Sequence, residues 1–280
     1  MSRTILITGC SSGIGEHAAR SLRERGWRVF ATARKTEDVT RLEEEGFEAL
    51  QLDLDDSTSI ESAVDEVLRR TGGTLDALFN NGAWGLPGAV EDLTRDALRA
   101  QFETNLFGWL ELTNRLIPVM RRQGHGRIVQ CSSVLGYAPF PYRGAYSMSK
   151  FALEGLSDTL RMELRGSGIH VSLVEPGPIA TRFRANALTA FRRWVTIEGS
   201  VHEAQYRRQL ERLQKEGPAA PFTLPPEAVT EKLVHALESR RPRLRYPVTV
   251  PAIAFAWLKR LLPGRWMDLV LLRASGGGKR

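Results

Sequence analysis

Short apolar runs alternate with longer helical patterns over roughly the first 175 residues of the chain. The apolar runs predict strands at residues 4–8, 28–33, 49–52, 75–80, 127–131 and 169–174. Helical patterns lie between them, at residues 13–25, 57–70, 95–122 and 146–165, and residues 41–45 end a further, charged helical stretch. Strands and helices that alternate at this spacing predict a doubly wound α/β fold, with helices on both faces of a parallel sheet. Such strands are buried on both sides, which explains why they are apolar throughout.

The alternation stops near Pro176. Residues 180–225 combine scattered aromatic residues with many charges and several prolines. A helical pattern returns at 226–238, and 243–248 predicts a last strand. Because the pattern resumes so soon, we interpret 180–225 as a helical lid inside one domain of residues 1–250, and not as a second domain.

The positive charge of the chain is concentrated at its C-terminal end. Residues 240–280 contain ten Lys and Arg and one acid, a net charge of +9, whereas the whole chain carries +7. The rest is therefore close to neutral, which argues against nucleic acid as a partner.

Residues 251–273 predict two amphipathic helices and residues 274–280 a disordered tail. Leucine and tryptophan next to basic residues leave three roles open for these helices: a cover over a substrate pocket, a contact in a homo-oligomer (dimer or tetramer), or peripheral membrane contact. We favour packing over membrane contact.

The N-terminal segment and the two cysteines predict a cytoplasmic protein. About four apolar residues precede the first glycine turn, which is too few for a signal peptide or a membrane span. Cys10 and Cys131 are far apart and lie in apolar runs. We interpret them as buried, reduced thiols and not as a disulfide. No cluster of zinc-ligand type occurs, so we expect no metal.

A glycine-rich turn follows the first predicted strand and opens directly into a helix. Residues 8–15 are Thr-Gly-Cys-Ser-Ser-Gly-Ile-Gly. Glycines at these positions allow a tight turn and let backbone amides approach a pyrophosphate at the positive end of the helix. The position of the turn, at the start of a Rossmann-type repeat, favours nucleotide binding over a merely structural turn. The residues expected around the pyrophosphate are Gly9, Ser11, Ser12, Gly13, Ile14 and Gly15.

The spacing Thr-Gly-x-x-x-Gly-x-Gly resembles that of the short-chain dehydrogenase/reductase family. The resemblance implies that the end of the second strand selects the cofactor, an acidic residue there favouring NAD. This chain has Arg34 and Lys35 at that point, with no acid before Glu37. An arginine offers a planar set of donors to a 2′-phosphate. We therefore expect NADP(H) as the cofactor.

The resemblance also implies further nucleotide contacts on the next two strands. Asp53 resembles the family residue that hydrogen-bonds adenine, with Leu54 beside it. Asn80 and Gly82 belong to the loop after the fourth strand, where the family usually has Asn-Asn-Ala-Gly. This chain has Gly82 followed by Ala83. Because both residues stay small, we expect an altered loop geometry that still binds the cofactor.

A tyrosine and a lysine four residues apart are candidates for proton transfer. The pKa of a tyrosine is ordinarily near 10, which makes it a poor proton donor and acceptor at neutral pH. Lys150 lies one helical turn after Tyr146, so its ammonium group is expected to stabilise the phenolate and lower that pKa. The pair by itself is a weak signal, since about one match is expected by chance in a chain of this length.

The family resemblance extends to the residues that surround such a pair. Ser133, thirteen residues before Tyr146, has the spacing of the serine that polarises the substrate oxygen; Ser132 is the alternative. Asn105 resembles the asparagine that holds a water behind the lysine. Pro176 and Gly177 resemble the turn against the nicotinamide, with Thr181 bonding its carboxamide. The resemblance covers about residues 3–182 and makes Asn105, Ser133, Tyr146 and Lys150 the expected catalytic set, with Tyr146 and Lys150 also contacting the cofactor.

The side chains expected around the substrate are apolar or aromatic. The expected contacts are Trp84, Leu135, Tyr142 and Phe183. Further candidates are Leu86, Tyr137, Phe140, Phe191 and Trp194, and about half of the whole set is expected simply to pack the core. A pocket of this kind predicts a lipophilic aldehyde or ketone that is reduced to its alcohol. The chain as a whole resembles the branch with 17β-hydroxysteroid and retinol dehydrogenases and their bacterial relatives, including NADP-dependent aldehyde reductases.

Two other functions remain as alternatives. A non-catalytic, NADP-binding regulator has the same fold, but such proteins often lack the tyrosine or the lysine, and both are present here. A sugar-nucleotide epimerase or dehydratase uses the same Tyr/Lys chemistry. Those enzymes usually carry Gly-x-x-Gly-x-x-Gly and a larger substrate domain, and this sequence shows neither.

Overall fold

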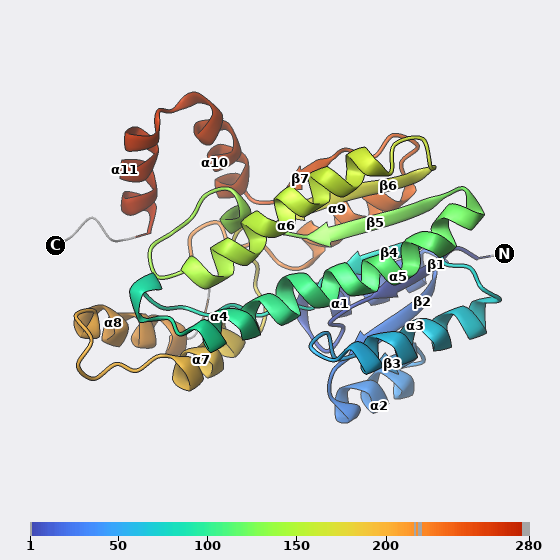
Figure 1. The fold of residues 1–280 in the computed structure, drawn as a ribbon, viewed down its shortest axis with the longest axis horizontal. Coiled ribbons are helices and arrows are strands. Elements are labelled where there is room, and N and C mark those ends of the chain that lie inside the picture. Colours follow the sequence, from blue (N-terminus) through green and yellow to red (C-terminus); the bar gives the residue numbers. More distant parts are fainter. Residues whose placement is uncertain (1, 216, 218–219, 276–280) are drawn as a thin grey trace.

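A computed structural model describes residues 2–215, 217 and 220–275 (Figure 1). Its core is a sheet of seven parallel strands in the order β3-β2-β1-β4-β5-β6-β7. The strands are β1 (Thr4–Ile7), β2 (Arg28–Ala33), β3 (Glu48–Gln51), β4 (Ala77–Asn80), β5 (Gly126–Cys131), β6 (Ile169–Glu175) and β7 (Arg245–Pro247). The predicted doubly wound sheet is thus confirmed, with strand ends shifted by one or two residues.

Helices cover both faces of the sheet. In Figure 1, α3 (Ser57–Thr71), α5 (Gly108–Gln123) and α6 (Gly144–Glu163) lie in front of it. Helices α1 (Gly13–Glu24) and α9 (Glu227–Glu238) pack against each other on the other face. Helix α2 (Thr36–Glu44) connects β2 to β3. Because both faces are covered, a central strand such as β1 is buried at every position, which explains its continuous apolar run.

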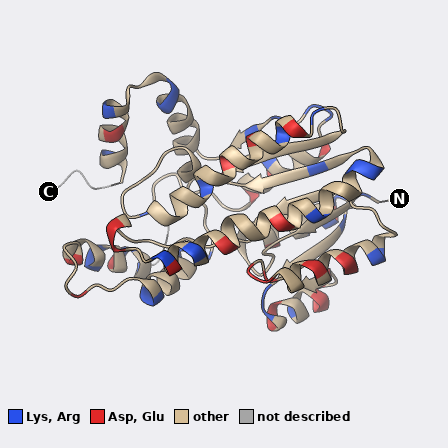
Figure 2. Cartoon of the chain, in the orientation of Figure 1, with Lys and Arg blue, Asp and Glu red and all other residues tan. Residues whose placement is uncertain are grey.

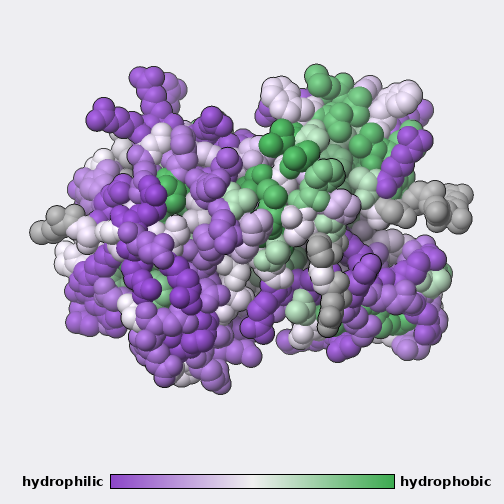
Figure 3. All heavy atoms as spheres, turned by 180° about the vertical axis from the view of Figure 1, so that it is seen from behind, coloured by the Kyte–Doolittle hydropathy of each residue, from purple (hydrophilic) through white to green (hydrophobic). Residues whose placement is uncertain are grey.

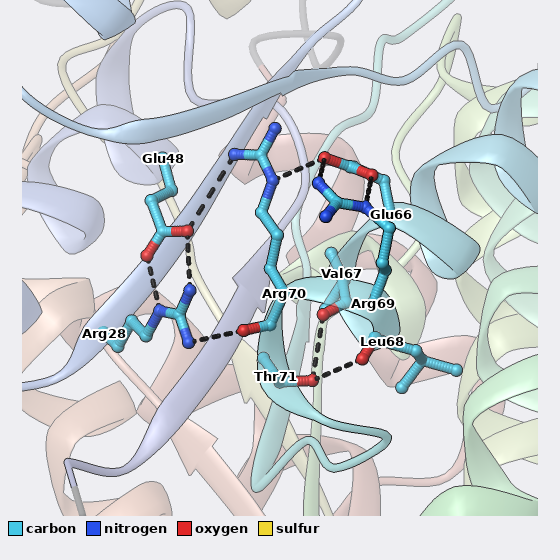
Figure 4. A network of polar contacts seen from close by, with 8 residues as sticks. All are labelled: Arg28, Glu48, Glu66, Val67, Leu68, Arg69, Arg70 and Thr71. Atoms are coloured by element: carbon cyan, nitrogen blue, oxygen red, sulfur yellow. Dashed lines mark hydrogen bonds and ion pairs between the residues drawn. The ribbon is translucent and has the colours of Figure 1, made fainter.

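A polar network fixes the end of α3 to the outer strands (Figure 4). Arg28 at the start of β2 donates to Glu48 of β3 and to the carbonyl of Arg70. Arg69 and Arg70 both donate to Glu66, and these hydrogen bonds lower the pKa of Glu66 to about 2. The network lies at the surface, so it orients the helix end more than it stabilises the fold.

Helix α3 begins at the predicted residue, whereas a second helix differs from the sequence prediction. Ser57 is the first residue of α3, and the capping side chain is that of Asp56, which accepts a hydrogen bond from the Thr58 amide. The single helix predicted at 95–122 is interrupted. Helix α4 (Arg95–Phe102) runs into a π-helical turn, η2 (Glu103–Phe107), before α5 begins. A π turn contains one extra residue per turn, and such turns are frequent at functional sites.

The segment predicted as a lid forms two helices, α7 (Phe183–Trp194) and α8 (Glu203–Gln214). The two helices pack on each other and around Tyr206, whose hydroxyl accepts from the Ala89 amide at 3.0 Å. Two further helices follow β7, α10 (Val250–Leu261) and α11 (Gly264–Ala274). All four lie beyond the carboxyl ends of the strands (Figure 1).

Other predictions concern the two cysteines and the last residues. Cys10 and Cys131 are buried, and both are free thiols, as predicted. Helix α11 ends one residue later than predicted, and the part of the predicted tail from residue 276 onward lies outside the described residues. Over the part of the chain that is described, no helix combines the length and apolar character needed to cross a membrane.

Candidate active site

The strand order reverses between β1 and β4, so the loops after these two strands diverge and leave a crevice. The glycine-rich turn after β1 lies at this point. Gly9 has a φ of +73°, and a Cβ atom there would approach the Gly82 Cα to 2.6 Å. A Cβ on Gly15 would approach the Gly9 carbonyl oxygen to 2.3 Å. The two glycines therefore allow a contact between backbones that no other residue permits.

The first turn of α1 suits an anion. Ser12 is the N-cap residue in an extended conformation, and its side chain makes no capping hydrogen bond. The amides at this helix end are therefore left for a ligand. Next to it is an open hollow of about 640 Å³ that reaches from Ser12 and Gly13 to Thr181 and Arg182. A Cβ on Gly13 would lie 2.9 Å from Thr181 Cγ2, so Gly13 and Thr181 face each other closely. This arrangement fits the pyrophosphate of a dinucleotide.

Two residues that the sequence did not single out hold this turn in place. The Thr8 hydroxyl accepts from the amides of Asn81 and Gly82, both at 2.8 Å. Arg41 of α2 donates to the Ser11 carbonyl at 2.9 Å. Thr8 stands inside the glycine motif, but its role depends on a loop 73 residues away in sequence. No local signal in the sequence identifies Arg41.

The residues predicted to contact the nucleotide from β2 and β3 lie where those strands end. Arg34 is exposed directly after β2, and burial raises the pKa of the nearby Asp55 carboxyl, an effect that the Arg34 charge partly offsets. Asp53 follows β3, and its side chain accepts from the Asp55 amide at 3.1 Å. The Leu54 side chain lies beside Gly82, whose added Cβ would be 3.3 Å from it. The small residue at 82 therefore lets these loops approach one another.

The Asn80 side chain points away from the phosphate turn. It donates to Thr113 at 3.0 Å and to Gln130 at 2.9 Å, and it is fully buried between β4, β5 and α5. Its neighbour Asn81 instead donates to the Thr8 carbonyl at 3.0 Å. Any contact of Asn80 with a nucleotide therefore has to come from its backbone.

The Tyr146 and Lys150 side chains meet on one face of α6. Lys150 is buried, and its Nζ donates to the Cys131 carbonyl at 2.8 Å. The same nitrogen lies 4.1 Å from the Trp109 ring centre and 5.7 Å from that of Tyr146. Trp109 in turn donates to the Gly82 carbonyl at 2.8 Å. Trp109, which the sequence analysis did not identify, therefore connects the lysine to the cofactor loop.

Burial changes the pKa values of this pair. Desolvation lowers the pKa of Lys150 from 10.5 to about 8. It raises the pKa of Tyr146, while the nearby Ser133 hydroxyl acts in the opposite direction. From the sequence, Lys150 is expected to lower the pKa of the tyrosine. In the structure that pKa is raised instead. The physical reason is that burial removes water from the phenolate, and this desolvation is the largest effect on the Tyr146 pKa.

Ser133 and Ser132 have different surroundings. Ser133 lies near the Tyr146 phenol, donates to the Pro176 carbonyl at 3.4 Å and accepts from the Leu135 amide. Ser132 lies beside the Glu154 carboxyl group, whose pKa it lowers, although burial raises that pKa overall. Of the two serines, Ser133 is the one that shares a site with Tyr146.

Asn105 occupies the π turn between α4 and α5. Its side chain donates to the Trp84 carbonyl at 2.9 Å and to the Ser149 hydroxyl at 3.3 Å, and it accepts from the Trp84 amide. Ser149 is the residue before Lys150. The extra residue in the π turn thus brings Asn105 next to both the catalytic helix and the loop after β4.

The turn after β6 joins the site to the C-terminal helices. Pro176 accepts a hydrogen bond from the Val134 amide at 2.8 Å. A Cβ on Gly177 would lie 2.0 Å from the hydroxyl oxygen of Thr249, the residue that caps α10. Only glycine fits at this contact. Thr181, further along the turn, accepts from the Phe183 amide at 3.3 Å.

One predicted substrate residue packs on the catalytic tyrosine, and a second lies in the loop after β4 that Asn105 holds. The Phe183 ring packs edge-on against the Tyr146 ring at 5.3 Å between centroids, and 37% of this residue is exposed. Trp84 is held by Asn105 and donates from its indole to Thr104 at 2.8 Å. The partly exposed Phe183 ring therefore adjoins the Tyr146 ring.

The other two predicted substrate residues pack against neighbouring elements. Leu135 lies in η3 (Val134–Gly136), which α10 covers, and it packs with residues of α10 and α11. Tyr142 contacts the lid, its ring edge-on to those of His202 and Tyr206. Its φ of +61° is unusual for a side chain of this size and marks local strain. Substrate contact by these residues stays a prediction.

Among the other candidates, Tyr137 donates to the Ala252 carbonyl of α10 at 2.8 Å. Phe140 packs edge-on against Phe255 of the same helix. Leu86 belongs to an apolar cluster with residues of the lid, and Phe191 and Trp194 belong to α7 of the lid and join such clusters, so several of these side chains pack the interior, as expected.

Comparisons with known proteins agree with this geometry. A family model described as short chain dehydrogenase matches residues 3–190. The uncharacterized oxidoreductase YbbO of Escherichia coli (strain K12) is 47% identical, over 97% of this chain and 94% of the relative. An NADPH-dependent 3-dehydrocapnine reductase from Ornithobacterium rhinotracheale is 31% identical, covering 97% and 96%. The human 17-beta-hydroxysteroid dehydrogenase type 1 is 35% identical, covering 89% and 78%.

Proposed function

Because the chain belongs to the short-chain dehydrogenase family of oxidoreductases, we propose that it uses NADP(H) to reduce a lipophilic aldehyde or ketone. The observation that carries the proposal is the packing of the exposed Phe183 ring against the catalytic Tyr146. A carbonyl group that reaches the tyrosine must therefore carry apolar substituents that replace water on Phe183. Two relatives support this class, since one is named for 3-dehydrocapnine and one for a hydroxysteroid.

The preference for NADP(H) rests on the end of β2. Arg34 is exposed there, and Glu37 is the first acidic residue after it. A guanidinium group suits a phosphate, and an acid that would repel one is missing from the strand end. The relative from Ornithobacterium rhinotracheale is described as NADPH-dependent, which supports the same choice.

The residues of the site suit proton transfer to a carbonyl oxygen. A bound nicotinamide nucleotide supplies the hydride, and the glycine-rich turn, Arg34 and Thr181 are the residues that would hold it. Tyr146 is protonated at neutral pH, as a tyrosine ordinarily is, and can donate its proton to the substrate oxygen once the phenolate that forms is stabilised. Ser133 is placed to bond the same oxygen, and the Lys150 ammonium stabilises the phenolate that remains. Asn105 holds the Trp84 loop and Ser149 in position.

The proposal is tested by following NADPH oxidation with aliphatic aldehydes, retinal and steroid ketones, each repeated with NADH. We expect turnover with NADPH and long-chain substrates. Arg34→Glu is expected to raise KM for NADPH at least about tenfold, because a charge-assisted contact contributes about 1.5–3 kcal/mol, and to leave KM for NADH nearly unchanged. Arg99→Gln, which removes an exposed cation on α4, is the matched control. Equal effects of Arg34→Glu on both cofactors would contradict the NADP(H) preference. If none of the compounds supported NADPH oxidation, the alternative function of a non-catalytic, NADP-binding regulator would be favoured.

The pKa of Lys150 predicts an alkaline limit to activity. The ammonium form is the active one, and it is lost as the pH rises through about 8, while Tyr146 keeps its proton to higher pH. We therefore expect kcat/KM for NADPH, which reports groups of the free enzyme, to fall above about pH 8. In Lys150→Arg the guanidinium group stays charged over this pH range. The fall in kcat/KM above about pH 8 should therefore disappear, even where the activity itself is reduced. A limb that is the same in both proteins would show that another group titrates.

A further inference from the structure

The two C-terminal helices, residues 250–274, form a hairpin that is apolar on both of its sides. On the inner side, Ala252 and Phe255 of α10 and Met267 and Leu271 of α11 are buried against η3 and the segment that follows it. This packing accounts for one apolar stripe on each helix. The predicted amphipathic helices thus pack against the domain with one side, as the favoured role requires.

The outer side carries a second apolar stripe. Trp257 is 59% exposed, Leu261 72% and Trp266 65%. They belong to a set spaced three or four residues apart along each helix, which places its members on one face: Val250, Ile253, Trp257 and Leu261 on α10, and Trp266, Leu269 and Leu272 on α11. We call this set the outer face. It lies within the largest green area of Figure 3, at the upper right of the molecule seen from behind.

Cations flank the outer face. The hairpin carries Lys259, Arg260, Arg265 and Arg273, all exposed, and one acid, Asp268, as Figure 2 shows for α10 and α11. A helix that buries one side in a protein usually has polar residues on the other. Here tryptophan and leucine occupy that side, and Arg260, Arg265 and Arg273 border it, which is the composition of a helix lying at a lipid interface. Lys259 instead points toward α6, where its ammonium group lies 4.5 Å from the centre of the Phe151 ring.

We infer that the outer face binds the surface of a membrane that contains anionic lipids. The charge pattern favours lipid over a second copy of the chain. A two-fold contact through this face would bring the three arginines of one hairpin against the three of the other, with a single acid on each to offset them. Anionic headgroups, in contrast, attract the three arginines that border the apolar stripe.

The hairpin also adjoins the catalytic crevice, so membrane binding would affect how a substrate reaches it. The hairpin contacts η3 with its inner side, and Leu135 of η3 is one of the predicted substrate residues. Tyr137 is bonded to α10, and Gly177 touches its cap residue Thr249. Membrane docking would therefore place the catalytic crevice beside the lipid. This part rests on the proposed function, whereas binding to lipid does not.

The test is co-sedimentation of the full chain with vesicles of phosphatidylcholine, alone or mixed with phosphatidylglycerol. We expect binding to the mixed vesicles, weaker binding to the neutral ones, and a blue shift of tryptophan emission on binding. Removing a cation, as in Arg260→Gln and Arg265→Gln, should weaken binding to the mixed vesicles about fivefold for each charge. The double variant Trp257→Ser with Trp266→Ser should lower the partition coefficient at least about tenfold.

Met162→Ser is the matched control, because Met162 is 61% exposed on α6, away from the outer face. Its binding should equal that of the unchanged chain. Equal partitioning of the unchanged chain and the double tryptophan variant would overturn the inference. Light scattering could instead show that the unchanged chain is a dimer and the double variant a monomer. If neither protein then bound vesicles, the inference would also be overturned, and the outer face would be assigned to contact with a second copy. Because sedimentation requires no substrate, a failure here is distinct from a failure of the proposed reaction.

Discussion

Replacing Tyr146 by Phe is expected to lower kcat about 10²–10⁴-fold, the range that a positioned proton donor contributes. The change removes one oxygen atom and leaves the ring, which packs against Phe183. The Lys150 ammonium keeps its bond to the Cys131 carbonyl, so the nucleotide site is expected to remain intact. Fluorescence titration should therefore give an NADPH affinity within a few-fold of that of the unchanged chain, while steady-state oxidation is nearly lost.

Tyr246→Phe is the control for this loss. Tyr246 is a buried tyrosine of β7 whose hydroxyl accepts from the Arg243 amide at 2.8 Å, outside the catalytic crevice. We expect it to retain the activity of the unchanged chain. If Tyr146→Phe turned over at a rate near that of Tyr246→Phe, another group would have to supply the proton and the proposed mechanism would be wrong.

Replacing Arg245 by Met is expected to destabilise the fold by about 3 kcal/mol at pH 8, the lower end of the range for breaking a buried ion pair. Arg245 donates to Glu154 at 3.0 Å and to Asp158 at 2.7 Å, and its Nε lies 3.2 Å from Glu175. Glu154 and Glu175 are almost fully buried. Burial raises the pKa of both, that of Glu175 to about 8, so ionising them without the guanidinium group is unfavourable.

The cost of this substitution should depend on pH. A carboxyl group whose pKa is raised in the folded state binds protons more tightly there than in the unfolded chain, so stability falls as the pH rises from the unfolded pKa to the folded one. Urea unfolding at pH 5.5 and pH 8 is thus expected to show the larger loss at pH 8. Arg161→Met, which breaks a partly exposed pair with Asp158, should cost less than about 1 kcal/mol. Similar losses for both variants, or no change with pH, would show that Arg245 does not compensate buried charge.

Glu175 illustrates how closely stability and the site are linked. It is the last residue of β6, directly before Pro176 and Gly177 of the turn predicted to contact the nicotinamide. An unpaired charge at this position would disturb that turn as well as the core. No local pattern indicates this cluster, because its members come from β6, β7 and two successive turns of α6.

The sequence alone determined the order of strands and helices, the parallel sheet, the phosphate turn and the pair of Tyr146 and Lys150. These features are local: an apolar run, a glycine at a tight turn and a spacing of four residues each depend on neighbours in the chain. Ser133, Asn105 and Thr181 were identified from the spacing that the family shows. That spacing reflects contacts in the folded protein, which the local sequence around these residues does not predict.

Tertiary structure alone decided the features that depend on contacts between distant segments. It turned the Asn80 side chain into the core, interrupted the helix at Asn105 with a π turn and placed Trp109 against Lys150. It also reversed the expected pKa shift of Tyr146, because burial is a property of the whole fold and not of a four-residue spacing. The same holds for the outer face: the sequence showed apolar and basic residues in the last helices, and only packing determined which of them remain exposed.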